Sequence, residues 1–143
     1  MIKKPIRSFR DLDVYQNTYE ASLIIAKKIL PRLPESEKYD LCSQLSRSSK
    51  AVPRLIAEGY AKKHQRSGFQ KYLDDAMAEC NETIVNLEHT KDIYHVEMEL
   101  SIVLIDKYDK AARQLFNLAE AWDLFKNRRR TTMPYNDTGS DAV

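Results

Sequence analysis

The spacing of its apolar residues constrains this chain more than any other feature of the sequence. Apolar residues recur every three or four positions in four separate stretches, which matches the α-helical period of about 3.6 residues. The most regular stretch has its apolar positions at Leu100, Leu104, Tyr108, Ala111, Leu115, Leu118, Trp122 and Phe125. Such an alternation is typical of the seam between the helices of a bundle.

The first expected helix follows an extended, basic lead-in at residues 1–10. Ser8 and Asp11 have the spacing of a capping box, in which each side chain satisfies a free backbone N–H group. Pro31 and Pro34 should end this helix, because proline lacks the amide donor and restricts the residue before it. Its predicted buried stripe consists of Leu12, Tyr15, Tyr19, Leu23, Ala26 and Leu30.

The second expected helix runs from about Ser36 to His64 and contains Pro53. An interior proline removes one hydrogen bond and usually kinks a helix. The sequence therefore predicts either one helix kinked near Pro53 or two shorter helices. The residues that can form its buried face are Leu41, Leu45, Val52, Ile56 and Tyr60.

The third expected helix opens at a second capping box, formed by Ser67 and Gln70, and breaks around His95. The fourth follows, and we expect a disordered tail over residues 128–143. Only 3 glycines and 5 prolines occur in 143 residues, which argues against a protein with many strands and turns. The predicted fold is therefore all-α: an antiparallel up-and-down four-helix bundle over residues 11–127.

Charge is unevenly distributed along the chain, although the net charge is only +2. Seven Lys or Arg and a single acid, Glu58, lie between Arg47 and Lys71, which gives this segment a charge of +6. Ten acids and two bases lie between Tyr72 and Asp109, which gives −8. This division favours self-assembly or a charged partner.

The basic segment supplies the candidate nucleic-acid-binding site. Its residues are Arg47, Lys50, Arg54, Lys62, Lys63, Arg66 and Lys71. The first three project from one side of the second helix, and clusters of this kind attract phosphates. The alternatives are a solvated face, or a face that pairs with the acidic third helix of a neighbouring subunit. Only Tyr60 and Phe69 are interleaved with the basic residues, so base stacking is expected to contribute little.

Residues for catalysis or metal binding are not arranged in a recognisable pattern. A di-metal carboxylate bundle needs Glu-x-x-His motifs, and the nearest match is Asp92 with His95. Cys42 and Cys80 form no C-x-x-C pair and are expected to be free thiols in a reducing compartment. We therefore expect a non-enzymatic, cytoplasmic protein without metal, cofactor or membrane span.

Three stretches resemble a known family. They are Ser8-Phe-Arg-Asp-Leu-Asp-Val-Tyr-Gln16, the segment from Leu41 to Tyr60 with Ile56-Ala-Glu-Gly59, and Phe69-x-x-Tyr-Leu-x-x-Ala76. They are similar to the four-helix bundles encoded in intervening sequences of ribosomal RNA genes, to which the accessory variability proteins of diversity-generating retroelements are related. The resemblance implies a homopentameric ring and, for the retroelement branch, binding to nucleic acid and to a reverse transcriptase.

Two functions follow as expectations. The first is a non-enzymatic scaffold associated with nucleic acid, in which a ring of bundles presents basic surfaces to RNA or DNA. The alternative is a structural or protein-interaction bundle with no nucleic-acid role.

Overall fold

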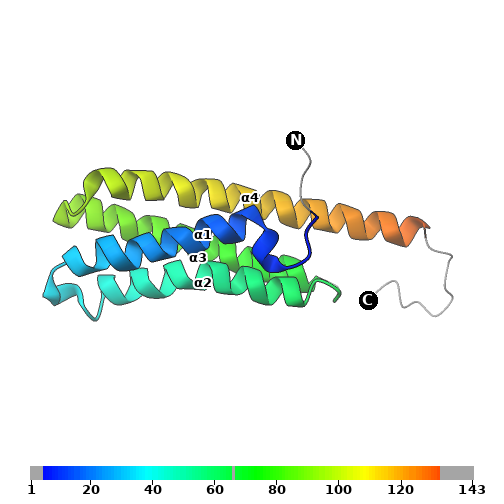
Figure 1. The fold of residues 1–143 in the computed structure, drawn as a ribbon, viewed down its shortest axis with the longest axis horizontal. Helices are drawn as coiled ribbons and strands as arrows, with labels where there is room; N and C mark the ends of the chain where they lie inside the picture. Colours follow the sequence, from blue (N-terminus) through cyan, green and yellow to red (C-terminus); the bar gives the residue numbers. More distant parts are fainter. Residues whose placement is uncertain (1–4, 66, 133–143) are drawn as a thin grey trace.

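The chain folds into helices and the turns between them, with no strand, over residues 5–65 and 67–132, which the computed structural model describes. The long helices are α1 (Asp13–Ile24), α2 (Leu41–Ala61), α3 (Gly68–Tyr94) and α4 (Met98–Thr132). Successive helices run in opposite directions and are joined at alternate ends (Figure 1). Since α2 packs against α3, α3 against α4, and α1 against both α2 and α4, the predicted all-α four-helix bundle is confirmed.

The capping box at Ser8 forms as predicted, but it caps a different element. The Ser8 hydroxyl accepts a hydrogen bond from the Arg10 N–H group at 3.0 Å, and Asp11 accepts one from the Ser8 N–H group at 3.1 Å. These bonds close a 3₁₀ turn, η1 (Phe9–Asp11), and α1 begins two residues later. The helix then continues as a π-helical turn, η2 (Ile25–Ile29), and a 3₁₀ turn, η3 (Leu30–Arg32).

The buried face of α1 and η2 is rotated from the predicted stripe. The buried residues are Val14, Thr18, Ala21, Ser22, Ile25 and Ile29. Tyr19 and Leu23, predicted to be buried, are 48% and 37% exposed. Thr18 and Ser22 can face the core because their hydroxyls donate to the carbonyls of Val14 (2.7 Å) and Tyr19 (2.6 Å).

The second helix is a single helix, because α2 continues through Pro53 without a break. The alternative of two shorter helices is therefore wrong. The expected start near Ser36 is also wrong, since a separate 3₁₀ turn, η4 (Glu35–Glu37), precedes α2. Near its end, Gly59 allows α3 to approach closely: a Cβ atom on Gly59 would lie 2.6 Å from the Cβ atom of Tyr72.

The predicted capping box of α3 does not form. Ser67 has a left-handed backbone conformation with φ of 59°, and its side chain caps no amide. A capping side chain normally belongs to a residue with an extended backbone, which places its oxygen over the first turn. At the other end, α3 stops at His95 as expected, where φ is 53°.

The fourth helix is longer than expected. It extends to Thr132, so residues 128–132, predicted to lie in the disordered tail, are helical. The remainder of the predicted tail, residues 133–143, lies outside the described residues.

A buried polar layer fixes α2 against α3. The Thr83 hydroxyl donates to the Ser48 hydroxyl at 2.8 Å, and the Asn86 amide donates to the same oxygen at 3.4 Å. Ser48 and Thr83 are fully buried and Asn86 is 8% exposed. Because buried polar groups need partners, this layer sets the register of the two helices and with it the residues that α2 presents to solvent.

Candidate nucleic-acid interface

The predicted basic residues lie on the outer side of α2 and around the turn between α2 and α3. Lys50, Arg54, Lys62 and Lys71 are exposed, and Lys63 is partly exposed. Arg66 lies outside the described residues. The up-and-down connection places the turn and its lysines at the end of the bundle where α2 stops and α3 begins (Figure 1).

Arg47 is engaged within the chain. Its guanidinium pairs with Glu79 of α3 at 2.9 Å and also with Glu82. The hydrogen bond to Glu79, followed by the charges of both carboxylates, raises the pKa of Arg47. Pairing with an acidic third helix was expected only as an alternative, and between subunits; here the acids belong to the same chain.

The other basic side chains keep their charge largely free of acids. The Arg54 Nε atom lies 3.8 Å from a carboxylate oxygen of Glu58, and both side chains are exposed. Such surface pairs are weak and are readily exchanged for another anion. Among the described residues, no carboxylate forms an ion pair with Lys50, Lys62, Lys63 or Lys71.

Two of these lysines lie against aromatic rings. Lys62 Nζ donates to the Tyr72 hydroxyl at 2.9 Å and lies 5.1 Å from the centre of that ring. This hydrogen bond is the main reason why the pKa of Lys62 is raised. Lys63 Nζ lies 3.9 Å from the centre of the Tyr60 ring. The position of Tyr72 was missed in the sequence because it depends on the close approach of the helices at Gly59.

The thiol of Cys80 and the phenol of Tyr108 lie in the core, and Cys42 is partly buried beside it. Cys80 is fully buried, and burial raises its pKa to about 12, so this thiol is protonated at neutral pH. Burial likewise raises the pKa of Cys42 and of Tyr108. In the part of the chain that the structure describes, no three His, Cys, Asp or Glu side chains are grouped to hold a metal ion. None of the helices in these described residues has the length and apolar character of a membrane span.

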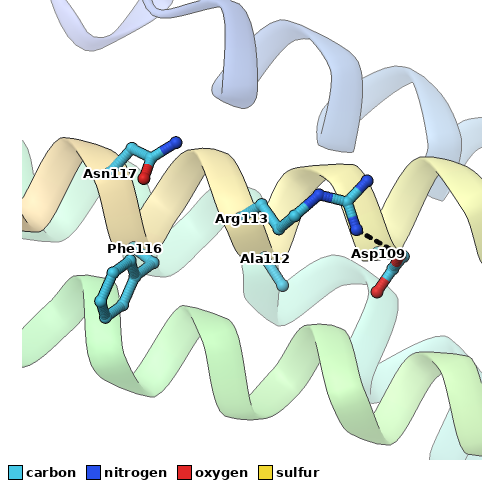
Figure 2. A pocket seen from close by; sticks show the side chains of 5 residues that line it. All are labelled: Asp109, Ala112, Arg113, Phe116 and Asn117. Carbon is cyan, nitrogen blue, oxygen red and sulfur yellow. Dashed lines mark hydrogen bonds and ion pairs between the residues drawn. The ribbon is translucent and has the colours of Figure 1, made fainter.

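Apolar side chains are exposed on α4. Ile102 and Phe116 are 55% and 52% exposed. Figure 2 shows Phe116 beside a surface hollow that is also lined by Asp109, Ala112, Arg113 and Asn117. In that view Phe116 points toward α3 and away from α1. We call Ile102 and Phe116 the α4 apolar surface.

A second apolar surface lies on α1. It consists of Tyr19 and Leu23, and Tyr19 stacks on Tyr15 with ring centres 5.9 Å apart. Tyr15 in turn packs edge-to-face on Phe9 at 4.8 Å, and the turn that holds Phe9 contacts α2. This α1 apolar surface therefore lies on the α2 side of α1, whereas the α4 apolar surface lies on the α3 side of α4.

These features define a class of protein: a small antiparallel four-helix bundle that is basic at its α2–α3 end and carries two separate apolar surfaces. Residues 10–117 match the family of 23S rRNA-intervening sequence proteins, and the chain belongs to that family. The family expected from the three sequence stretches is thereby confirmed, while its relation to the retroelement accessory proteins stays a prediction. No curated protein matches the chain.

Proposed function

We propose that this protein is a non-enzymatic scaffold associated with nucleic acid, which presents the basic end of its bundle to RNA or DNA. The observation that carries the proposal is the set of outward cations without strong acid partners: Lys50, Arg54, Lys62, Lys63 and Lys71. The chain carries 21 acidic residues, yet among the basic residues of the site that the structure describes, only Arg47 is held by acids of another helix. Basic side chains without strong acidic partners can bind the phosphate groups of a nucleic acid.

We also propose that the bundles assemble into a closed ring, which would repeat the basic end on every subunit. The α1 and α4 apolar surfaces support this part of the proposal, because they lie on different sides of the bundle. Two different surfaces of one chain can pair head-to-tail, and such a heterologous interface closes into a ring when the rotation allows it. The number five comes from the family resemblance alone.

Gel-shift titration of structured RNA and duplex DNA tests the nucleic-acid role. The triple variant Lys50→Glu, Arg54→Glu, Lys71→Glu should abolish binding without loss of helicity or assembly. The matched control Lys27→Glu, Lys28→Glu, Lys38→Glu has the same net charge but changes exposed lysines at the opposite end of the bundle, and it should still bind. Each phosphate contact should add about −0.9 to the log–log salt slope for duplex DNA, or about −0.7 for single strands.

The competing site is the basic C-terminal part of α4. Deletion of residues 127–143 removes Arg128, Arg129 and Arg130 and should leave binding largely intact. Loss of binding on this deletion, together with normal binding by the triple variant, would contradict the assignment of the site.

The second candidate function is a structural or protein-interaction bundle with no nucleic-acid role. The exposed apolar surfaces favour it, since exposed apolar patches often mark protein interfaces. A wild-type protein that assembles but binds neither RNA nor DNA at low salt would establish this alternative. The reverse transcriptase that the retroelement resemblance implies is one protein partner of either function, and co-purification of the two proteins tests it.

A further inference from the structure

We propose that the α2–α3 end of the bundle binds unpaired nucleotides, with nucleobases stacked on Tyr60 and Tyr72 and phosphates held by Lys62 and Lys63. This inference rests on the proposed nucleic-acid function and names its ligand class: single-stranded nucleic acid. It also revises the expectation, drawn from the sequence, that base stacking contributes little.

The first platform is Tyr60, which is partly exposed and is held from behind. Its ring meets Phe69 edge-on, with centres 6.1 Å apart and an angle of 90° between the planes. Phe69 is 1% exposed and meets Trp122 of α4 in the same way at 5.4 Å. The row Tyr60–Phe69–Trp122 therefore crosses the bundle from α2 through α3 to α4 and fixes the orientation of the Tyr60 ring.

The second platform is Tyr72, which is partly exposed and lies opposite Gly59, where α3 approaches α2 closely. The missing side chain at Gly59 makes room for it, since a Cβ atom there would meet Tyr72 at 2.6 Å. Its hydroxyl accepts a hydrogen bond from Lys62. Both aromatic residues thus lie on rigid helices within reach of a lysine. Proteins that bind single-stranded nucleic acids combine aromatic and basic side chains in this way.

The lysines do not block these platforms. Lys63 lies over the Tyr60 ring and Lys62 over the Tyr72 ring, but a cation over an exposed ring is held less strongly than a stacked nucleobase. An incoming base can therefore replace the ammonium group on the ring face. The displaced lysine, which belongs to the turn that follows α2, is then free to pair with the phosphate of the same nucleotide.

A duplex cannot use this arrangement in the same way. Its bases are stacked on one another, so only phosphates and groove edges are accessible to side chains. Single strands and unpaired loops expose base faces, and every base has such a face, so the site should tolerate different sequences.

An abasic oligomer separates stacking from charge in the unmodified protein. The probes are oligo-uridylate and oligo-thymidylate of roughly 15 nucleotides, a length within the site sizes of known single-strand-binding proteins. The controls are abasic RNA and abasic DNA strands of the same length and charge. We expect the base-bearing strand to bind about 5- to 150-fold more tightly per stacked base than its abasic counterpart. The RNA and DNA arms identify which backbone the site accepts.

The outcomes separate this inference from the proposed function. Equal affinity for base-bearing and abasic strands on both backbones would overturn the stacking site and leave the phosphate-binding function standing. Absence of binding to every strand at low salt would overturn the proposed function itself.

Variants then assign the effect to its residues. Tyr60→Leu should lower the preference for the base-bearing strand by the contribution of one stacked base and leave the salt slope unchanged, whereas Tyr60→Phe, which keeps the ring, should behave like the wild type. Lys63→Gln should reduce the salt slope and retain the preference. A Tyr60→Phe protein without the preference, at wild-type helicity and thermal stability, would contradict the role of the ring.

Discussion

At the scale of single residues, Glu37 shows how one carboxylate joins the start of α2 to the end of α3. It accepts a hydrogen bond from the Leu41 N–H group at 3.2 Å, at the start of α2, and another from the hydroxyl of Tyr94 near the end of α3. These bonds, that of Tyr94 first, lower the pKa of Glu37 below its ordinary value of 4.5. Both donors favour the ionised form, which is why the carboxylate is easier to deprotonate in the folded protein.

The lowered pKa of Glu37 predicts that the folded protein becomes less stable at acid pH. Because the pKa of Glu37 is lower in the folded state than in the unfolded state, its stabilising contribution is present above pH 4.5 and is lost as the pH falls through the lowered value. Thermal unfolding followed by circular dichroism between neutral pH and about pH 3 should show a smaller acid-induced loss of Tm in Glu37→Gln than in the wild type. Identical pH profiles for the two proteins would mean that the hydrogen bonds to Glu37 do not couple to folding.

The residues of the candidate site were predictable only in part. The basic residues of α2 and of the turn follow from sequence spacing, because residues three or four apart share a helix face. The partners of those residues do not follow: Arg47 meets Glu79, and Lys62 meets Tyr72, only once the register of α2 and α3 is known. That register depends on contacts between residues distant in sequence, such as Ser48 with Thr83.

At the scale of elements, the existence of the four helices could be read from the apolar period, but the buried face of α1 could not. The helix carries two adjacent stripes, and the more apolar one, with Tyr19 and Leu23, is the more exposed. Hydroxyl groups that bond to their own helix make Thr18 and Ser22 acceptable in the core, and a sequence pattern counts them as polar. In α4, by contrast, the predicted residues Leu104, Tyr108, Ala111 and Leu115 are buried.

The packing of α4 gives a prediction with an internal control. Leu104 and Leu115 are fully buried, and Leu104→Ala or Leu115→Ala should each reduce the free energy of unfolding by about 2–5 kcal/mol, through lost burial and the cavity left behind. Ile102→Ala, two residues from Leu104 and 55% exposed, should change it by no more than about 0.5 kcal/mol. Denaturant unfolding at a concentration where the protein is monomeric provides the measurement. A large loss for Ile102→Ala under those conditions would show that its side chain is buried within one chain.

At the scale of the whole molecule, the opposite charges of the two sequence segments partly pair with each other at the surface of one chain. Arg47 of the basic segment binds Glu79 and Glu82 of the acidic one, which helps to join α2 to α3. The attraction that the sequence suggested between subunits is therefore in part an attraction within one chain. The apolar surfaces on α1 and α4 stay exposed on the single chain.

The ring proposal can be tested by breaking each apolar surface separately. Tyr19→Asp disables the α1 apolar surface and Phe116→Asp the α4 apolar surface, and both side chains are about half exposed, so each variant should fold. In a heterologous ring, either change breaks every interface, and light scattering should report the 16.6 kDa monomer for each variant alone.

Mixing the two variants then distinguishes a head-to-tail interface from a self-complementary one. The Phe116→Asp protein keeps an intact α1 apolar surface, and the Tyr19→Asp protein keeps an intact α4 apolar surface, so one interface can form between them. The mixture should therefore yield a heterodimer of twice the chain mass and no larger species, because the remaining surfaces of that pair are both disabled. If the α4 apolar surface instead paired with its own copy, the Tyr19→Asp protein would dimerise alone and mixing would create no new complex.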